Sequence, residues 1–201
     1  MTDLQLVLAS QSPRRRNLLE RLSIRPSIEP ADVDETPEPE ERPEAYVERL
    51  ARTKASASLG PGRVVIAADT VVVRDGVILG KPRDRADAID ILRSLSGRSH
   101  QVLSGVAVAV TDPDGSSRVA TGIESSVVQV EPLSEDRIDW YLSTGEADDK
   151  AGAYGLQGAA GLFADRVEGS VNNVIGLPLT LLDRLFGELG LDLLSFADPS
   201  A

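Results

Sequence analysis

The sequence has no cysteine, a single histidine and few aromatic residues, and each shortage excludes a class of function. Without cysteine, the chain has no thiol nucleophile, no disulfide framework and no thiolate zinc site. The one histidine, His100, cannot supply a metal site that needs several. It follows Ser99 at the start of an expected strand, so we expect an exposed or hydrogen-bonded role rather than catalysis. With 3% aromatic residues, the core should consist mainly of valine, leucine, isoleucine and alanine.

Long hydrophobic runs are also missing, and basic residues are outnumbered by acidic ones. No apolar run approaches the roughly 20 residues that span a bilayer. The N-terminal residues do not have the basic, apolar and small-residue regions of a signal peptide. We therefore expect a cytoplasmic protein without a membrane partner. The net charge of −11 opposes binding to DNA or RNA polymers, but it permits a small anion held by a few focused cations.

The pattern of apolar residues predicts an α/β fold of the mixed α+β kind. Valine-rich runs alternate with polar, helix-forming stretches, and 41% hydrophobic residues can support a core. A length of 201 residues fits one domain, and no linker divides the chain. We expect a single domain over residues 1–201.

The stretch 63–82 is the part around which the rest is organised. The run Val64–Ile66 is typical of a strand buried on both faces, and it leads through two alanines to Asp69. A hairpin turn is expected at Asp75-Gly76, followed by Lys81 beside a proline. One interpretation is that Asp69 caps a turn and Lys81 is solvated. The other is that one apolar framework delivers an acid and a lysine to the same place.

The N-terminal segment combines a strand, a helix start and several cations. The strand expected at Leu4–Ala9 leads to Ser12, a good N-cap, and to Pro13, which suits the first helical position. Such a helix start offers free N–H groups to an anion. Arg15 shares a stripe with leucines on the apolar side of the helix. The polar side chains available here are Ser10, Ser12, Arg14, Arg15 and Arg16. They indicate either a bound anion or a capped helix with a basic, solvated first turn.

Two further segments carry charges that could face a cleft. The helix expected over Glu44–Leu59 places Lys54 on its inward stripe, where the lysine must either snorkel to solvent or meet a negative partner. The acidic trio Asp32, Asp34 and Glu35 follows a short strand expected at Ile24–Glu29. The trio either faces the cleft or belongs to the solvated, proline-rich loop that follows it.

The remaining elements alternate between helices and strands. Trp140 is expected in the core, and the glycine-rich segment Gly145–Gly158 is either a plain flexible loop or a loop in which Gln157 reads a base edge. The expected helices are Asp84–Leu95, Ser134–Ser143 and Pro178–Leu189, and the expected strands are Gln101–Val110, Arg118–Val130 and Leu162–Val167, the first two joined by a turn at 112–115.

Short motifs in a fixed order cover nearly the whole chain. They are Leu8–Arg15 (LASQSPRR), Val33–Glu35 (VDE), Ala51–Ala55 (ARTKA), Ala68–Thr70 (ADT), Gly80–Pro82 (GKP), Leu95–Gly97 (LSG), Ser104–Val106 (SGV), Lys150–Tyr154 (KAGAY), Gln157-Gly158 and Val174–Pro178 (VIGLP). Each motif is weak alone, but the ordered set is specific. On these motifs the chain resembles the Maf family of nucleoside triphosphate pyrophosphatases.

The resemblance implies a fold, a reaction and a cofactor. The fold is Maf/ITPase-like, with a central bent mixed sheet flanked by helices and two lobes around a deep nucleotide cleft. The reaction splits a nucleotide into its monophosphate and pyrophosphate with a divalent cation, Mg²⁺ or Mn²⁺. A homodimer is plausible from the family alone.

The resemblance also assigns roles to single residues. Asp69 matches the catalytic base, and Glu35 matches an acid near the metal, so the implied metal ligands are Glu35 and Asp69. Arg14, Thr70 and Gln157 match positions that set base preference, and their identities resemble the dTTP/UTP subgroup. The residues that match phosphate-binding positions are Ser10, Ser12, Arg14, Arg15, Lys54 and Lys81.

Two alternatives stay open at this point. The same reaction could act on 7-methyl-GTP or on a non-standard purine such as ITP. The chain could instead be a nucleotide-binding regulator of cell division or septum formation, in which hydrolysis is incidental. The acid and the lysines favour turnover, because binding alone does not need a base placed for water.

Overall fold

The described strands form one mixed, seven-stranded sheet in a computed structural model that describes residues 4–112 and 115–198. The sheet order is β2-β1-β3-β5-β6-β7, with β4 on the same edge of β3 as β1. The strands are β1 (Gln5–Leu8), β2 (Ser27–Ile28), β3 (Arg63–Arg74), β4 (Val77–Leu79), β5 (Ser99–Thr111), β6 (Ser117–Val130) and β7 (Ala164–Glu168). β1 runs parallel to β2 and β3, and the other pairings are antiparallel.

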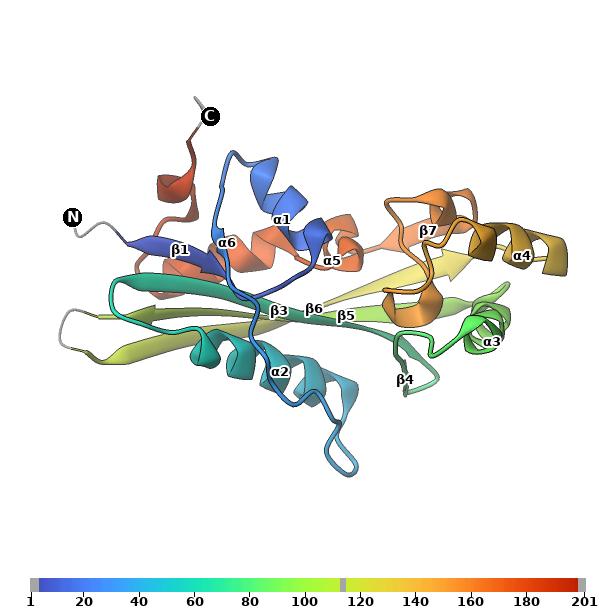
Figure 1. The fold of residues 1–201 in the computed structure, drawn as a ribbon, viewed down its shortest axis with the longest axis horizontal. Coiled ribbons are helices and arrows are strands. Elements are labelled where there is room, and N and C mark those ends of the chain that lie inside the picture. The colour runs from blue at the N-terminus through green and yellow to red at the C-terminus, as the bar shows by residue number, and fades with distance from the viewer. Residues whose placement is uncertain (1–3, 113–114, 199–201) are drawn as a thin grey trace.

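Helices cover both faces of the long strands β3, β5 and β6 (Figure 1). One face carries α2, whereas α1, α5 and α6 lie on the opposite face, and α3 and α4 lie near the end that holds β4 and β7 (Figure 1). The α-helices are α1 (Pro13–Glu20), α2 (Pro43–Ala57), α3 (Arg85–Leu95), α4 (Glu135–Ser143), α5 (Val171–Ile175) and α6 (Leu179–Glu188), and short 3₁₀ turns occur at Ala151–Ala153, Ala159–Leu162 and Leu193–Phe196. The mixed α/β prediction is confirmed.

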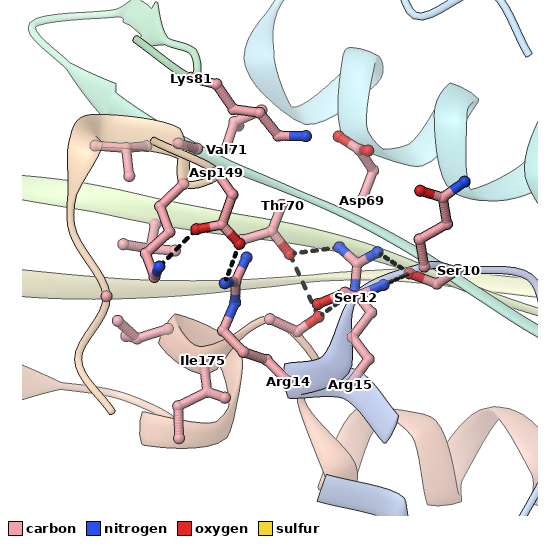
Figure 2. A pocket seen from close by; sticks show the side chains of 18 of the residues that line it. Ser10, Ser12, Arg14, Arg15, Asp69, Thr70, Val71, Lys81, Asp149 and Ile175 are labelled. Atoms are coloured by element: carbon pink, nitrogen blue, oxygen red, sulfur yellow. Dashed lines mark hydrogen bonds and ion pairs between the residues drawn. The ribbon is translucent and has the colours of Figure 1, made fainter. Parts of the chain in front are cut away.

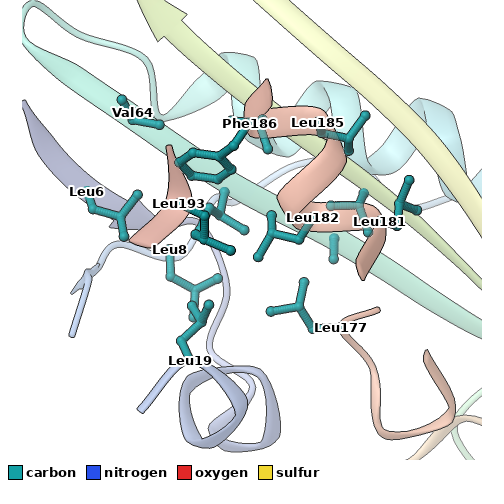
Figure 3. Close-up of a cluster of buried hydrophobic side chains, with 14 of the residues drawn as sticks. Leu6, Leu8, Leu19, Val64, Leu177, Leu181, Leu182, Leu185, Phe186 and Leu193 are labelled. Atoms are coloured by element: carbon teal, nitrogen blue, oxygen red, sulfur yellow. The ribbon is translucent and has the colours of Figure 1, made fainter. Parts of the chain in front are cut away.

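The apolar core divides along the three long strands. At one end, α1 and α6 pack leucines and Phe186 against β1 and the first half of β3, as Figure 3 shows. At the other end, α3 and α4 enclose an aromatic group in which Tyr141 and Phe163 meet edge-on at 5.2 Å between ring centroids. The strands β3, β5 and β6 therefore contribute side chains to the apolar clusters at both ends. Polar side chains lie in the region between these two clusters.

The edge of β3 has a gap between two neighbouring strands. β1 pairs with β3 only as far as Ile66, and β4 begins its pairing at Val72. Within the described residues, 67–71 therefore pair only with β5. Asp69 and Thr70 lie in this gap on consecutive positions, so their side chains point to opposite faces of the sheet. The gap gives ligands access to the middle of a buried strand.

Glycine lets α2 approach the sheet closely beside Asp69. Gly105 on β5 is the register partner of Asp69, and a Cβ built on it would lie 2.2 Å from the carbonyl oxygen of Val47 in α2. No real Cβ atom tolerates that distance to backbone, so the contact requires glycine. This contact brings the inward face of α2, with Lys54, onto the strand that carries Asp69.

Several local expectations are confirmed. Pro13 is the first residue of α1, and Asp75-Gly76 forms the β3–β4 hairpin with positive φ at both residues (52° and 79°). The predicted turn at 112–115 includes residues 113–114, which lie outside the described residues. None of the described helices has the length and apolar character needed to span a membrane.

Other expectations are wrong. Trp140 is 45% exposed instead of buried, because Ile138, Tyr141 and Leu142 form the inward stripe of α4. Asp69 lies inside a twelve-residue strand and caps no turn. Ser12 precedes α1 as expected, but its side chain makes no capping hydrogen bond. The strand expected at 24–29 contracts to β2, with Ile24 in an isolated bridge to Ala197.

Candidate active site

A cavity of about 710 Å³ opens at the gap in the β3 edge. Its walls come from the segment after β1, the start of α1, the inward face of α2, β3 itself, and the loops before β7 and after α5. Figure 2 shows side chains from the segment after β1, the start of α1, β3 and the loop before β7 pointing toward one another. Every residue to which the family resemblance assigned a role lines this cavity: Ser10, Ser12, Arg14, Arg15, Glu35, Lys54, Asp69, Thr70, Lys81 and Gln157. Arg16, the third arginine at the start of α1, does not line it and pairs with Glu20 instead.

Lys54 connects the two candidate acids. Its Nζ lies 2.7 Å from Asp69 Oδ1 and 2.6 Å from Glu35 Oε1. The side chains of Lys54 and Asp69 are only 9% and 13% exposed, whereas that of Glu35 is 56% exposed. The lysine therefore meets negative partners rather than snorkelling. Because a buried ion pair is costly unless well matched, its place at an open cavity favours a functional role.

A tyrosine of α2 holds the acidic loop in place. The Tyr46 hydroxyl donates to the backbone oxygen of Glu35 at 2.9 Å. Burial, together with the nearby charges of Asp69 and Glu35, raises the pKa of Tyr46 to about 12, so the hydroxyl keeps its proton as a donor. Asp34 turns away and accepts a hydrogen bond from the backbone N–H of Thr36. Of the acidic trio, only Glu35 lines the cavity.

Arg15 is fixed at three points. Its Nε donates to the backbone oxygen of Gly176 (2.9 Å), Nη1 to Ser10 Oγ (2.9 Å) and Nη2 to Thr70 Oγ1 (3.2 Å). The α1 stripe predicted this inward direction. Burial lowers the pKa of Arg15 from its usual value, and the charge of Asp69 partly offsets that effect. An arginine with most of its donors placed in advance loses little freedom when it binds a phosphate.

Arg14 is held by an acid that the sequence analysis gave no role. Its Nη1 lies 3.1 Å from Asp149 Oδ2, and Lys150 Nζ lies 2.6 Å from the other oxygen of the same carboxylate (Figure 2). Burial raises the pKa of Asp149, but the hydrogen bonds from Lys150 and Arg14 outweigh this and hold the pKa below its usual value. The neighbouring motif at 150–154 is the signal that could have found Asp149.

Lys81 and Gln157 are among the exposed residues of the cavity. Lys81 follows β4 and points toward Asp69 across the cavity mouth (Figure 2). Gln157 lies in the loop before β7, among the glycines that the sequence analysis singled out. That loop is not plain coil, because Ala151–Ala153 and Ala159–Leu162 form 3₁₀ turns around it.

Comparison with known sequences assigns this arrangement to a family. Residues 5–189 match the family described as "Maf-like protein". The chain belongs to the Maf family. Three curated relatives, each described as a dTTP/UTP pyrophosphatase, come from Anaeromyxobacter sp. strain Fw109-5, Anaeromyxobacter dehalogenans strain 2CP-C and Myxococcus xanthus. They are 49%, 50% and 48% identical, over 92%, 94% and 94% of this chain and 90%, 96% and 94% of their own lengths.

The donor set of this Maf-family cavity suits a hard divalent cation. Glu35 and Asp69 each place an oxygen beside the same atom, Lys54 Nζ, so the two carboxylates converge. The described residues contain no cluster of three or more metal-ligating side chains. Mg²⁺ is commonly held by one or two carboxylates, with waters and substrate phosphates completing its shell. Two convergent carboxylates in a cavity lined by cations therefore fit such an ion when a polyphosphate is present.

Proposed function

We propose that this protein hydrolyses dTTP and UTP to their monophosphates and pyrophosphate. The observation that carries the proposal is the arrangement of Asp69, a largely buried acid, within a cavity that also presents Arg15, Lys54 and Lys81. The names of the three relatives supply the substrate class. Water attacks the α-phosphorus, the bond from that phosphorus to the α–β bridging oxygen breaks, and pyrophosphate leaves with the electron pair.

Cations and hydrogen-bond donors would hold the polyphosphate tail. A nucleoside triphosphate carries about four negative charges, so its binding needs several positive groups. Arg15 and Lys81 supply charge, the hydroxyls of Ser10 and Ser12 supply donors, and the N-terminus of α1 adds free N–H groups and a favourable dipole. Arg14 would join them by exchanging Asp149 for a phosphate oxygen. In this way the phosphates are placed against Asp69 before any chemistry begins.

Asp69 is proposed as the general base. Its position inside β3 fixes the carboxylate, and a hydrogen bond from Lys54 orients one of its oxygens. The carboxylate would accept the proton of the attacking water as the bond to phosphorus forms. Glu35 and Asp69 would hold Mg²⁺ or Mn²⁺ which, when bound, supplies charge against the phosphate oxygens and lowers the pKa of a water.

Three positions are proposed to set the base preference. Arg14 and Thr70 line the cavity beside α1 and β3, and Gln157 lies in the glycine-rich loop opposite them. A carboxamide offers one donor group and one acceptor, which suits the paired polar edge of a pyrimidine.

We also propose that residues 1–201 act as one domain in the cytoplasm. We propose further that the protein forms a homodimer, which light scattering of the purified protein would test.

A nucleotide panel tests the reaction. Initial rates of pyrophosphate release would be measured for dTTP, UTP, the other common triphosphates, ITP and 7-methyl-GTP, with Mg²⁺, with Mn²⁺ and with EDTA. We expect dTTP and UTP to lead and EDTA to abolish turnover. A clear lead for 7-methyl-GTP or ITP would contradict the roles of Arg14, Thr70 and Gln157. Failure to release pyrophosphate from any nucleotide would favour a binding regulator.

The base assignment predicts the effect of a single substitution. Asp69→Asn keeps the shape and hydrogen bonds of the side chain but removes the proton acceptor, so pyrophosphate release from dTTP should fall at least ~100-fold. Circular dichroism should show that the variant is folded. Asp75→Asn is the matched control, because Asp75 lies at the exposed β3–β4 turn and pairs with Arg98, outside the cavity. A folded Asp69→Asn protein with full activity would overturn the assignment.

A further inference from the structure

A row of buried polar groups continues from Arg15 into the sheet. Ser104 on β5 is the register partner of Thr70 on β3, and the two hydroxyl oxygens lie 2.8 Å apart. The side chain of Ser104 is fully buried and does not line the cavity. Its hydroxyl donates to the backbone oxygen of Asn173 at 3.3 Å. A serine in a valine-rich strand is costly to bury unless its bonds are needed.

Either hydroxyl can donate across the 2.8 Å pair. In one arrangement Thr70 donates to Ser104, which donates to Asn173 O; in the other Ser104 donates to Thr70, which donates to Gly176 O at 3.4 Å. In both arrangements the bond to Ser104 orients the Thr70 hydroxyl, and Thr70 Oγ1 accepts from Arg15 Nη2. The series begins at Arg15 in the cavity and ends on α5.

The end of the series on α5 is firmly anchored. Asn173 is fully buried, and its Nδ2 donates to Val102 O (2.9 Å) and to Ser126 Oγ (3.0 Å). Three residues later, the backbone oxygen of Gly176 accepts from Arg15 Nε. Two of the three fixed points of Arg15 therefore depend on α5, one directly and the other through Ser104 and Thr70.

We propose that Ser104 is a positioning residue for Arg15 and acts through the Thr70 hydroxyl. The inference rests on the proposed function only for its kinetic consequence. Without the Ser104 hydroxyl, Thr70 loses its partner at 2.8 Å, and its proton is left with Gly176 O, 3.4 Å away, which already accepts from Arg15 Nε. One substitution thus weakens two of the three points that hold the guanidinium.

A spectroscopic test needs no substrate. The protein would be labelled with ¹⁵N-arginine, and the Nε–H resonance of Arg15 would be assigned by its loss in Arg15→Lys. In Ser104→Ala we expect that proton to exchange with solvent at least about fivefold faster, because its acceptor is shared and the side chain is less restrained. Ser96→Ala is the control. It removes a half-buried hydroxyl at the end of α3 that accepts from the backbone N–H of Leu133 and is not part of the series from Arg15 to α5.

A double-mutant cycle separates positioning from general destabilisation. In Ser104→Ala, kcat/KM for dTTP should fall about fivefold, and Ser96→Ala should stay within about twofold of the wild type. If Ser104 acts through Thr70, its effect should disappear in the Thr70→Val background, where no hydroxyl is left to orient. Equal losses in both backgrounds, or equal losses in the two serine variants, would refute the proposal.

The two tests fail separately. A wild-type protein that releases no pyrophosphate would defeat the proposed function, and the Arg15 exchange rate would still decide the role of Ser104. An unchanged Arg15 Nε–H in Ser104→Ala would defeat the positioning role, even if the wild-type enzyme were fully active on dTTP.

Discussion

His100 is the clearest residue-scale case of a titratable group that the fold keeps neutral. It is buried, and its Nε2 lies 2.6 Å from the hydroxyl oxygen of Tyr154, which lines the cavity. Its Nδ1 has no hydrogen-bond partner among the described residues. Burial lowers the pKa of His100 from 6.5 to about 4. The expected hydrogen-bonded role is therefore confirmed, while the exposed role is wrong.

The lowered pKa predicts a stability change with pH. Between pH 6.5 and 4 the unfolded chain binds a proton on His100 and the folded chain does not, so stability is lost as the pH falls through this window. From pH 7.5 to 4.5 the free energy of unfolding should decrease by about 2.5 kcal/mol more in the wild type than in His100→Gln, as measured by urea titration. Because the chain has one histidine, NMR of a tag-free protein reads its pKa directly. An imidazole that titrates at 6.5 would contradict the burial argument.

Residues also differ in how well the sequence predicts the position of their side chains in the site. Lys54 and Arg15 each shared a helical stripe with apolar residues, so their inward direction followed from period alone. Asp149 and Ser104 lie on no apolar stripe, so only the motifs at 150–154 and 104–106 mark their neighbourhoods, and their partners are 135 and 34 residues away in sequence. A contact of that range depends on strand register and loop path, which one sequence does not encode in any local pattern.

At the scale of elements, the packing of α2 on β5 determines where Lys54 meets Asp69. Gly105→Ala should therefore cost about 2–3 kcal/mol of unfolding free energy and reduce pyrophosphate release, because the new Cβ meets the Val47 backbone at 2.2 Å and must push α2 away. Urea unfolding and initial rates would measure both effects. Gly122→Ala on β6 is the control, since its Cβ would meet only the end of the Leu181 side chain, at 2.7 Å, and that side chain can move. A Gly105→Ala protein as stable as Gly122→Ala would count against this account.

The type of each helix or strand was predictable from the sequence, but strand continuity and the packing of elements against one another were less so. The apolar runs predicted the helices and long strands within a few residues, because burial on one face or both leaves a period in the sequence. The continuity of β3 through Asp69 was missed, because a charge in a strand usually marks its end. The charge of Asp69 is tolerated inside the strand because Lys54 forms an ion pair with it and the gap beside β1 gives it access to solvent. The prediction that Trp140 is buried was wrong because it relied on the size of the side chain, whereas the apolar stripe of α4 consists of other residues.

At the scale of the whole molecule, the cavity lies between two cores that share strands. One wall carries Ser10 and Arg15 from the end built on α1 and α6, and the other carries Lys81 and the glycine-rich loop from the end built on α3 and α4. The protein is acidic overall, with a net charge of −11, yet the cavity is lined by five arginine and lysine residues and only three acidic ones. A polyphosphate would thus join the two ends and relieve the repulsion among the cavity cations.

Binding at this position predicts a large thermal shift. With Mg²⁺ and a non-hydrolysable dTTP analogue at about 100 times its Kd, the folded state gains about 2.7 kcal/mol, which for a chain of this size raises Tm by roughly 5–10 °C. Lys81→Ala should reduce the shift at the same analogue concentration without changing the Tm of the free protein, because Lys81 is exposed and its charge serves the ligand. Arg83→Ala removes a cation two residues away that pairs with Asp87 outside the cavity, so its shift should match the wild type. Equal shifts in the two variants would mean that the analogue binds away from the gap in β3, and the phosphates would then have to be placed elsewhere on the molecule.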